Sequence, residues 1–276
     1  MIFYGPPGCG KTHRLLDEAA IRIQAGVSIE DIGFMSFTRK AAKEGLSRVG
    51  YNGLEAPWWR TIHSTCYKAM NLRRDEVLNE AQLIELGRDV GCEFTGKRDE
   101  FGFFAGKGDA EIMNCIHLAR NRMEPVEVTA ATLEVRAPLW RVKQIAEDIY
   151  NWKRERGLFD YTDMLEYCID HPDLLPELKV LIVDEAQDLT PLQWQVIDAV
   201  GQRCDEVIIA GDDDQGIYYW AGADVERLLK HDDESIILDK SHRVPKKVQE
   251  LADRIVTGIQ HRVEKEWKPR DEDVSV

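Results

Sequence analysis

Residues 5–12 constrain the fold more than any other segment of this chain. They read Gly-Pro-Pro-Gly-Cys-Gly-Lys-Thr, which fits the pattern G-x-x-x-x-G-K-[ST], and they stand between a short apolar run, Ile2 to Tyr4, and a segment with helical periodicity. In this pattern the glycines let backbone N–H groups turn around phosphate oxygens, and the N-terminus of the following helix adds positive potential. The segment predicts a phosphate-binding loop between a strand and a helix, with a structural glycine-rich turn as the alternative.

Further apolar runs of strand length alternate with helical stretches. They lie at residues 32–37, 180–183, 207–210 and 236–238, and the first of them is followed by a predicted helix at 39–49. Short continuous apolar runs are typical of strands that are covered on both faces of a parallel sheet. We therefore predict an α/β fold with a parallel sheet and helices on both faces.

Between the two groups of strands the pattern changes to helices. They are predicted at residues 80–90, 110–122 and 139–156, which indicates an inserted helical lobe. A final helix is predicted from Pro245 to about Glu264. Seven basic residues of the lobe are expected to be solvated on its surface, with contact to DNA as the alternative: Arg120, Arg122, Arg141, Lys143, Lys153, Arg154 and Arg156.

Charge and cysteine content narrow the classes of protein that fit. The 276 residues have a formal net charge of -14, so any contact with a polyanion must be local. The six cysteines show no C-x-x-C spacing, which argues against a zinc site, an iron–sulfur cluster or a disulfide framework. No apolar run approaches the roughly 18 residues that span a bilayer, and residues 1–5 lack a signal-peptide pattern. We expect no membrane partner and a cytoplasmic location.

Acidic residues follow one of the predicted strands. Asp184 and Glu185 come after the run 180–183, so they are expected at the carboxyl edge of the sheet, where ligands of such folds bind. There Asp184 and the Thr12 hydroxyl suit Mg²⁺, Lys11 can reach terminal phosphates, and Glu185 can polarise an attacking water. An acidic helix cap is the alternative for Asp184.

Residues 210–220 follow another predicted strand and carry a family resemblance. They read Ala-Gly-Asp-Asp-Asp-Gln-Gly-Ile-Tyr-Tyr-Trp, which resembles motif III of the UvrD/Rep branch of superfamily 1 helicases. The resemblance implies that Gln215 couples the γ-phosphate to the DNA site and that Trp220, with Tyr218 beside it, stacks on a base. An amide can sense phosphate and an indole can stack on any base. Packing in the core is the alternative for each aromatic residue.

Other segments resemble further blocks of this family. Residues 37–42, with Thr38 and Arg39, look like motif Ia, and residues 61–64, with His63 and Ser64, look like motif Ib; both touch single-stranded DNA in relatives, although each residue alone could be a helix cap or a surface residue. Residues 159–164 resemble an aspartate-rich block, in which we expect Asp160 only to cap a helix.

Residues 241–243, Ser-His-Arg, resemble motif IV. The resemblance makes Arg243 an arginine-finger candidate, with a surface salt bridge as the alternative, and puts His242 where many relatives stack a Tyr on adenine. Because only four residues precede Gly5, the family's upstream Gln segment is not expected here, which leaves base selectivity open.

The chain thus resembles the N-terminal ATP-binding domain of superfamily 1A (UvrD/Rep/PcrA-like) DNA helicases, a RecA-like P-loop NTPase with ATP and Mg²⁺ as cofactors. The resemblance implies four groups of site residues. The nucleotide would be bound by Gly5, Pro6, Pro7, Gly8, Cys9, Gly10, Lys11, Thr12, His13, Gln215, His242 and Arg243. Catalysis would rest on Glu185, Lys11, Gln215 and Arg243, the metal ion on Thr12 and Asp184, and single-stranded DNA on Thr38, Arg39, His63, Ser64, Tyr218 and Trp220.

The resemblance also implies a domain organisation and a function. Residues 1–70 and 158–240 would form the first motor domain (1A), 71–157 a 1B-like helical insertion, and 241–276 the incomplete start of a second RecA-like domain (2A-like). The expected function is that of a monomeric helicase motor that couples Mg-ATP hydrolysis to 3′–5′ translocation on single-stranded DNA, with protein partners in DNA repair or replication. The isolated chain is expected to be weakly active.

Three alternatives share some of these residues. A DNA-stimulated ATPase or switch in a repair, replication or defence complex would not unwind DNA. A P-loop kinase of small molecules would need only residues 5–12, and Glu185 and the Tyr-Trp block argue against it. A recruitment module without turnover would not need the intact Lys11, Asp184 and Glu185.

Overall fold

The computed structural model describes residues 1–36, 46, 50, 55–93, 97–106, 108–230 and 234–271. The chain divides into two compact units, each described here by itself. Unit 1 comprises Met1–Thr65, Leu175–Leu189 and Ile197–Val276, and unit 2 comprises Cys66–Leu174 and Thr190–Val196. Among the described residues, no helix has both the length and the apolar character that crossing a membrane requires.

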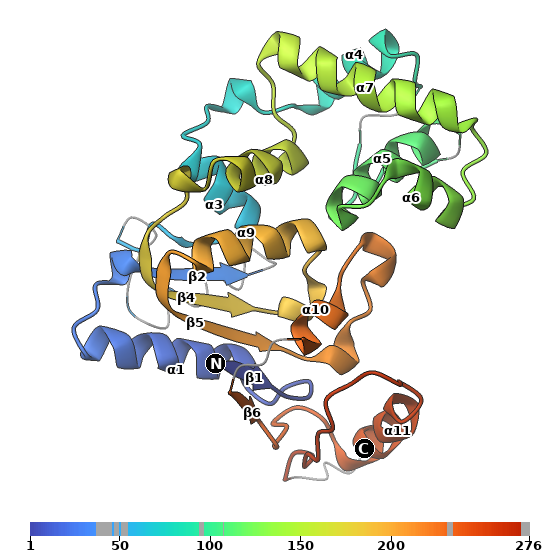
Figure 1. Ribbon diagram of the computed structural model, residues 1–276. Helices are drawn as coiled ribbons and strands as arrows, with labels where there is room; N and C mark the ends of the chain where they lie inside the picture. The colour runs from blue at the N-terminus through green and yellow to red at the C-terminus, as the bar shows by residue number, and fades with distance from the viewer. Residues whose placement is uncertain are drawn as a thin grey trace. The chain divides into compact units, whose positions relative to one another are not determined.

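Unit 1 is built on a parallel sheet (Figure 1). The described part of the chain contributes six strands in the order β3-β2-β4-β5-β1-β6. The strands are β1 (Ile2–Tyr4), β2 (Ile32–Ser36), β3 (Trp59–Arg60), β4 (Leu178–Asp184), β5 (Cys204–Gly211) and β6 (Ser235–Ile237). Every pairing between them is parallel, which confirms the predicted α/β class.

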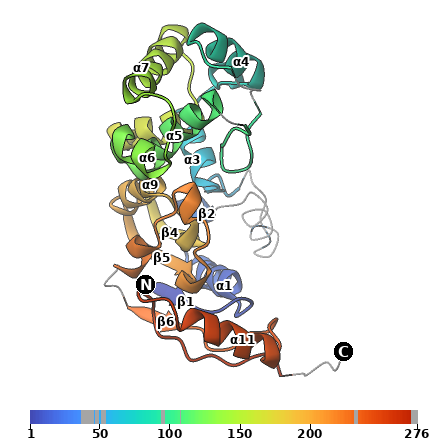
Figure 2. The same cartoon turned by 90° about the vertical axis from the view of Figure 1, so that its right-hand side faces the viewer.

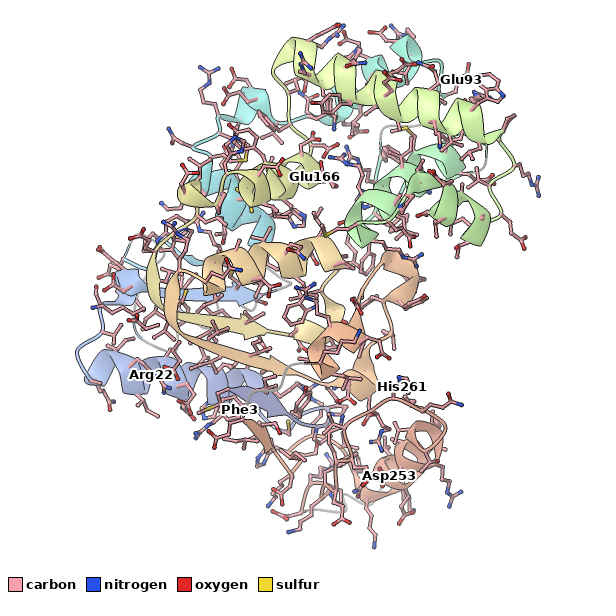
Figure 3. All side chains as sticks on the ribbon, viewed as in Figure 1. Phe3, Arg22, Glu93, Glu166, Asp253 and His261 are labelled. Atoms are coloured by element: carbon pink, nitrogen blue, oxygen red, sulfur yellow. The ribbon has the colours of Figure 1, made fainter. Side chains whose placement is uncertain are left out.

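The first strand lies in the interior of this sheet. Phe3 on β1 is in register with Ala210 on β5 and Ile236 on β6, and its side chain is fully buried (Figure 3). The helix α1 (Lys11–Gln24) follows β1 and lies along β4 and β5, where Leu15 and Leu16 join the core cluster of Phe3 (Figure 1). Burial of this apolar stripe fixes the N-terminus of α1 at the carboxyl edge of the sheet.

The predicted strands are all present, and one strand was not predicted. β3 has only two residues, too few for a sequence pattern, and its Trp59 stacks on Phe34 of β2 with ring centroids 5.0 Å apart. The predicted helix at 39–49 lies outside the described residues except for Leu46, which is helical and buried.

The last helix, α11 (Lys246–Val256), is shorter than predicted. The prediction that it reaches about Glu264 is wrong, because the helix ends at Val256 and Gly258, a weak helix former, follows. The side chain of Gln249 then donates to the carbonyl of Trp267, so the segment after the helix returns toward it. In two views, α11 lies on the β6 side of the sheet (Figures 1 and 2).

Unit 2 is helical, and the helices predicted in it are confirmed. The described helices that have not been named so far are α3 (Ile62–Ala69), α4 (Glu80–Asp89), α5 (Asp109–Arg122), α6 (Val126–Thr132), α7 (Leu139–Arg156), α8 (Tyr161–Asp170), α9 (Pro191–Gly201) and α10 (Val225–Leu229). Ile112 and Ile116 of α5 pack with Val142 and Ile145 of α7 in its core, while α10 belongs to unit 1 and α3 and α9 contribute to both units.

Asp160 caps the N-terminus of α8, as predicted. Its carboxylate accepts a hydrogen bond of 2.8 Å from the backbone N–H of Asp163, and Asp163 Oδ2 accepts one of 2.7 Å from the N–H of Asp160. Each side chain thus satisfies a donor at the start of the helix that has no partner within the helix.

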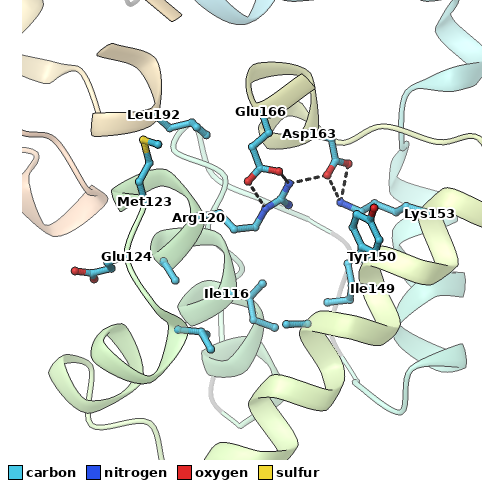
Figure 4. Close-up of a pocket in the computed structure, with 13 residues that line it drawn as sticks. Ile116, Arg120, Met123, Glu124, Ile149, Tyr150, Lys153, Asp163, Glu166 and Leu192 are labelled. Carbon is cyan, nitrogen blue, oxygen red and sulfur yellow. Dashed lines mark hydrogen bonds and ion pairs between the residues drawn. The ribbon is translucent and has the colours of Figure 1, made fainter. Parts of the chain in front are cut away.

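Three basic residues of unit 2 are largely buried, which corrects the prediction that they are solvated. Arg122 has a side chain that is 14% exposed and lies 3.6 Å from Glu124. The other two, Arg120 and Lys153, are labelled in Figure 4. Arg120 contacts Asp160, Asp163 and Glu166, with its Nη2 2.6 Å from oxygens of Asp163 and Glu166. The buried Lys153 places its Nζ 2.6 Å from Asp160 and Asp163. Arg120, Lys153, Asp163 and Glu166 line a pocket of about 540 Å³. A charge buried at this depth needs opposite charges around it, and α8 supplies them.

Candidate nucleotide-binding site

The phosphate loop, residues 5–12, connects β1 to α1. Gly8 has a φ of 73°, a left-handed conformation that favours glycine. Lys11 is buried, and its Nζ donates a hydrogen bond of 2.9 Å to the carbonyl of Gly5 in the same loop. To reach a phosphate, the ammonium group would exchange this hydrogen bond for one to the phosphate. Burial raises the pKa of the Cys9 thiol, so this side chain adds no negative charge to the loop. The loop therefore has the curvature and the cation that phosphate binding requires.

The two residues predicted to bind a metal ion, Thr12 and Asp184, meet at the carboxyl edge of the sheet. Thr12 Oγ1 at the start of α1 donates to Asp184 Oδ2 at the end of β4 at 2.7 Å, although these residues are 172 positions apart. Burial raises the pKa of Asp184 to about 6, against the effect of the Thr12 hydrogen bond. A hydroxyl and a carboxylate are hard oxygen donors of the kind that Mg²⁺ prefers, so this pair fits the predicted ion.

Glu185 has an unusual backbone and a side chain held by an amide. Its φ is 56°, an uncommon value for a residue with a side chain. Its Oε2 accepts a hydrogen bond of 2.8 Å from Gln187 Nε2, and Gln187 Oε1 accepts one of 3.0 Å from the N–H of Asp212. Strained backbone of this kind is found at functional sites, where the surrounding contacts maintain it. Sequence reasoning missed Gln187, although its place two residues after Glu185 was a signal.

Gln215 lies in the loop that follows β5. The short turn Asp213–Gln215 begins at Asp212, whose carboxylate accepts from the N–H of Asp214 and from Gln215 Nε2. Asp212 therefore connects Gln215 to Gln187, and through it to Glu185. The structure brings Gln215 and Glu185 into one hydrogen-bonded network.

The segment 241–243 contacts the phosphate loop directly. Ser241 Oγ donates to the carbonyl of Pro7 at 2.7 Å, and the N–H of His242 donates to the carbonyl of Gly8 at 2.9 Å. Arg243 packs against Gly8 and is exposed, and within the described part of the chain it makes no salt bridge. Ser241 is a second residue whose contact sequence reasoning did not foresee, although it stands next to His242.

His13, a predicted nucleotide-binding residue, lies near a carboxylate of its own helix. The imidazole of His13 is exposed, and its Nε2 lies 3.8 Å from Asp17 on the next turn of α1. Its contact with a nucleotide stays a prediction.

The predicted DNA-binding residues occupy three places. Tyr218 and Trp220 follow β5, with ring centroids 6.4 Å apart, and Trp220 is 53% exposed, so it is not a core residue. His63 and Ser64 lie at the start of α3, which follows β3. In the sheet, three strands, β2, β4 and β5, stand between β3 and β1. Thr38 and Arg39 lie outside the described residues.

A phosphate loop after an interior parallel strand, with an acidic pair at the end of a second strand, defines a RecA-like P-loop domain. A comparison with known protein families identifies the class of this domain more specifically. The sequence model of the UvrD/REP helicase N-terminal domain matches residues 1–235, and the chain belongs to this family. The predicted family resemblance is confirmed.

Individual relatives are similar at low identity. ATP-dependent DNA helicase PcrA of Bacillus subtilis is 26% identical over 301 residues, an alignment that covers 100% of this chain and 40% of the relative. Proteins of the same name from Staphylococcus epidermidis and Staphylococcus aureus are 25% and 23% identical, and the alignments cover 93% and 95% of this chain and 38% of each relative. The chain thus spans about two fifths of the length of these relatives.

Proposed function

We propose that this chain is the nucleotide-hydrolysing motor domain of an ATP-dependent DNA helicase. The observation that carries the proposal is the meeting of Thr12 and Asp184 at 2.7 Å, because it brings the phosphate loop and the acidic strand end to one place. The network from Glu185 to Gln215 supports it further, since it links the expected base to the expected phosphate sensor.

The roles of the residues follow from their chemistry. Lys11 and the loop N–H groups hold phosphate oxygens, and Thr12 and Asp184 hold Mg²⁺. Glu185 accepts a proton from the attacking water, and Arg243 neutralises charge at the γ-phosphate. ATP with Mg²⁺, when bound, supplies the phosphoryl group that is transferred to water.

The DNA side of the proposal rests on the exposed Trp220 and the half-buried Tyr218 beside it. Tyr218 and Trp220 follow Gln215 closely in the chain, so a change at Gln215 on hydrolysis can move a surface on which bases stack. Thr38, Arg39, His63 and Ser64 would contact the strand's phosphates and sugars. We propose translocation on single-stranded DNA in the 3′–5′ direction, on the basis of family membership.

The wider assignment also remains a proposal. Residues 1–70 and 158–240 would form the first motor domain, 71–157 a 1B-like insertion, and 241–276 the start of a second RecA-like domain. We propose a monomer that acts in the cytoplasm, where the six free cysteines stay reduced. Its protein partners would belong to DNA repair or replication.

The test is ATP turnover with and without a single-stranded oligonucleotide. We expect turnover that the oligonucleotide stimulates, a loss of about 100-fold or more in Glu185→Gln, and a loss of nucleotide binding in Lys11→Ala. The control is Glu177→Gln, which changes an exposed glutamate of unit 1 and should leave turnover unaltered. Turnover that neither Lys11→Ala nor Glu185→Gln lowers would contradict the proposed site. Stimulated turnover without strand displacement would favour a DNA-stimulated switch over a helicase.

A further inference from the structure

A buried lysine from beyond α11 contacts the loop that carries Gln215. Lys265 Nζ lies 3.1 Å from Asp212 Oδ1 and 3.1 Å from Asp214 Oδ2, and it also bonds Asp213 Oδ1. The side chain of Lys265 is 1% exposed. One ammonium group thus serves three consecutive carboxylates, which we call the aspartate loop (residues 212–214).

Neighbours of Lys265 hold the same loop. Arg262 donates from Nε and Nη2 to the two oxygens of Asp214, both at 2.7 Å, and the N–H of Val263 donates to Asp213 Oδ2 at 2.8 Å. His261, labelled in Figure 3, lies 3.3 Å from Glu226 of α10. A two-point contact between guanidinium and carboxylate fixes orientation as well as distance.

Residues that follow Lys265 also contact the segment 241–244, which carries Arg243. The carbonyl of Lys268 accepts a hydrogen bond of 2.8 Å from the N–H of Ser241, and the N–H of Arg270 donates to the carbonyl of Val244 at 3.0 Å. Residues 262–270, which we call the brace, therefore connect the Gln215 loop at one end to the Arg243 segment at the other.

The contacts continue from Lys265 into the nucleotide site. Asp212 offers one carboxylate oxygen to Lys265 and the other to Gln215 Nε2. Its backbone N–H donates to Gln187, which in turn donates to Glu185 at 2.8 Å. Asp212 thus connects Lys265 to the phosphate sensor through its carboxylate and to the expected base through its backbone N–H.

The charge of Lys265 depends on the carboxylates around it. Burial alone would lower the pKa of Lys265, but the carboxylates of the aspartate loop outweigh it and raise the pKa above its usual value. Lys265 therefore stays protonated. Replacing a buried ion pair by apolar residues of similar volume is often neutral or stabilising, so stability alone does not account for this cluster.

We propose that Lys265 is a positioning residue that sets the place of Gln215 and, through Asp212 and Gln187, that of Glu185. This inference rests on the proposed function for its catalytic consequence. The brace makes the position of Gln215 depend on the segment of Arg243, so the two groups expected at the γ-phosphate move together.

Lys265→Met tests the proposal, because methionine keeps the length of the side chain without its charge. We expect the rate constant for a single turnover of ATP to fall about 10-fold, while the affinity for a fluorescent ATP analogue changes by less than about 2-fold. In a Gln215→Ala background the same substitution should lower the rate no further, because residues that act through one another are not additive. Full additivity of the two losses would overturn the proposal.

A matched control and a second variant exclude a loss of folding. Lys268→Met changes a lysine on the brace whose side chain is 77% exposed, and it should leave the rate unchanged. If Lys265→Met does not fold, the double variant Asp213→Asn with Lys265→Met removes one buried charge of each sign. That variant should fold and still show the reduced rate; a wild-type rate would overturn the proposal.

A readout without turnover separates this inference from the proposed function. Amide hydrogen exchange of residues 212–217 should be faster in Lys265→Met by about 10-fold or more, with no change in residues 5–12. If the wild-type chain hydrolyses no ATP but this exchange rises, the proposed function fails and the positioning role stands. Unchanged exchange at 212–217 would overturn the positioning role whatever the turnover.

Discussion

Gly8 and Arg243 lie so close together that a Cβ atom on Gly8 would stand 2.4 Å from the Cβ of Arg243. Carbon atoms in contact are normally about 3.5–4.0 Å apart, so no larger residue fits at position 8 without movement of the Arg243 segment. The hydrogen bond from the N–H of His242 to the carbonyl of Gly8 holds this approach. The conformation of the phosphate loop and the position of the expected arginine finger therefore depend on each other.

We predict that Gly8→Ala lowers the affinity for a fluorescent ATP analogue by about 10-fold or more and destabilises the chain by about 1–3 kcal/mol. Both the left-handed φ of 73° and the contact with Arg243 contribute. Gly26→Ala is the matched control, because Gly26 has a φ of 96° but nothing within 4 Å of its would-be Cβ. It should lose stability through strain and keep its nucleotide affinity. Equal loss of affinity in both variants would refute the role of the Arg243 contact.

The Thr12 hydroxyl should contribute both to Mg²⁺ binding and to the stability of the folded chain. Thr12→Val removes the hydrogen bond to the buried Asp184, and we expect a loss of about 1–3 kcal/mol in the free energy of unfolding. The Mg²⁺ concentration at half-maximal nucleotide binding should rise about 10-fold. Titrations with Mg²⁺ and urea measure the two effects. Thr12→Ser keeps the hydroxyl and should restore both values; its failure to do so would show that the methyl group is what matters.

Trp220 provides the test of the DNA surface. We expect Trp220→Ala to weaken binding of a single-stranded oligonucleotide by about 10-fold, since stacking of one base on an aromatic ring contributes about 1–3 kcal/mol. Fluorescence anisotropy of a labelled oligonucleotide measures the affinity. Trp140→Ala removes another exposed indole, 70% exposed and on α7 of unit 2, and serves as the control. An equal effect of the two variants would leave the stacking role without support.

The parts of the fold that were predictable are those where one local pattern has one physical solution. The run at 180–183 must be buried on both faces, and parallel strands end at one edge, so Asp184 was expected near the phosphate loop before any coordinates. The structure confirms that proximity with the Thr12 hydrogen bond. The roles of these residues in binding and catalysis stay predictions.

The parts that were not predictable depend on partners far away in the sequence. Lys265 and Arg262 stand at the end of the predicted helix, where no local pattern indicates their partners, and only the fold brings them to aspartates about 50 positions earlier. The same partners explain why the predicted helix after Pro245 was too long: the chain leaves the helical path to reach them. Arg120 is a similar case, because its carboxylates lie on α8 and at the N-cap of that helix, 40 or more positions along the chain.

Arg120 should therefore act on stability. Arg120→Met leaves Asp160 and Asp163 with Lys153 as their cation and removes the arginine that Glu166 contacts. We expect a loss of about 3–5 kcal/mol in the free energy of unfolding, as for other broken buried ion pairs. Urea unfolding followed by circular dichroism measures it. Lys143→Met breaks an exposed pair with Glu127, worth about 0–1 kcal/mol, and is the control. A loss in Arg120→Met no larger than in the control would show that these carboxylates are solvated.

Asp188 should make stability depend on pH near neutrality. Burial, with the charge of Glu185 as a second cause, raises the pKa of Asp188 to about 7, well above the value of about 3.9 in an unfolded chain. The folded state then holds a proton that the unfolded state releases between about pH 4 and pH 7, so stability falls as pH rises through this window. Asp188→Asn cannot ionise and should escape that fall.

The melting temperatures of Asp188→Asn and wild type are compared without nucleotide and with EDTA. The difference, variant minus wild type, should be about 2–4 °C larger at pH 8 than at pH 5. This change corresponds to about 1 kcal/mol after allowance for partial solvation of the carboxyl group. Asp205→Asn, at an exposed position of β5, controls for the loss of one negative charge from a chain of net charge -14. It should shift the melting temperature equally at the two pH values. The same constant shift in Asp188→Asn would mean that Asp188 is ionised throughout the range, and the raised pKa would be wrong.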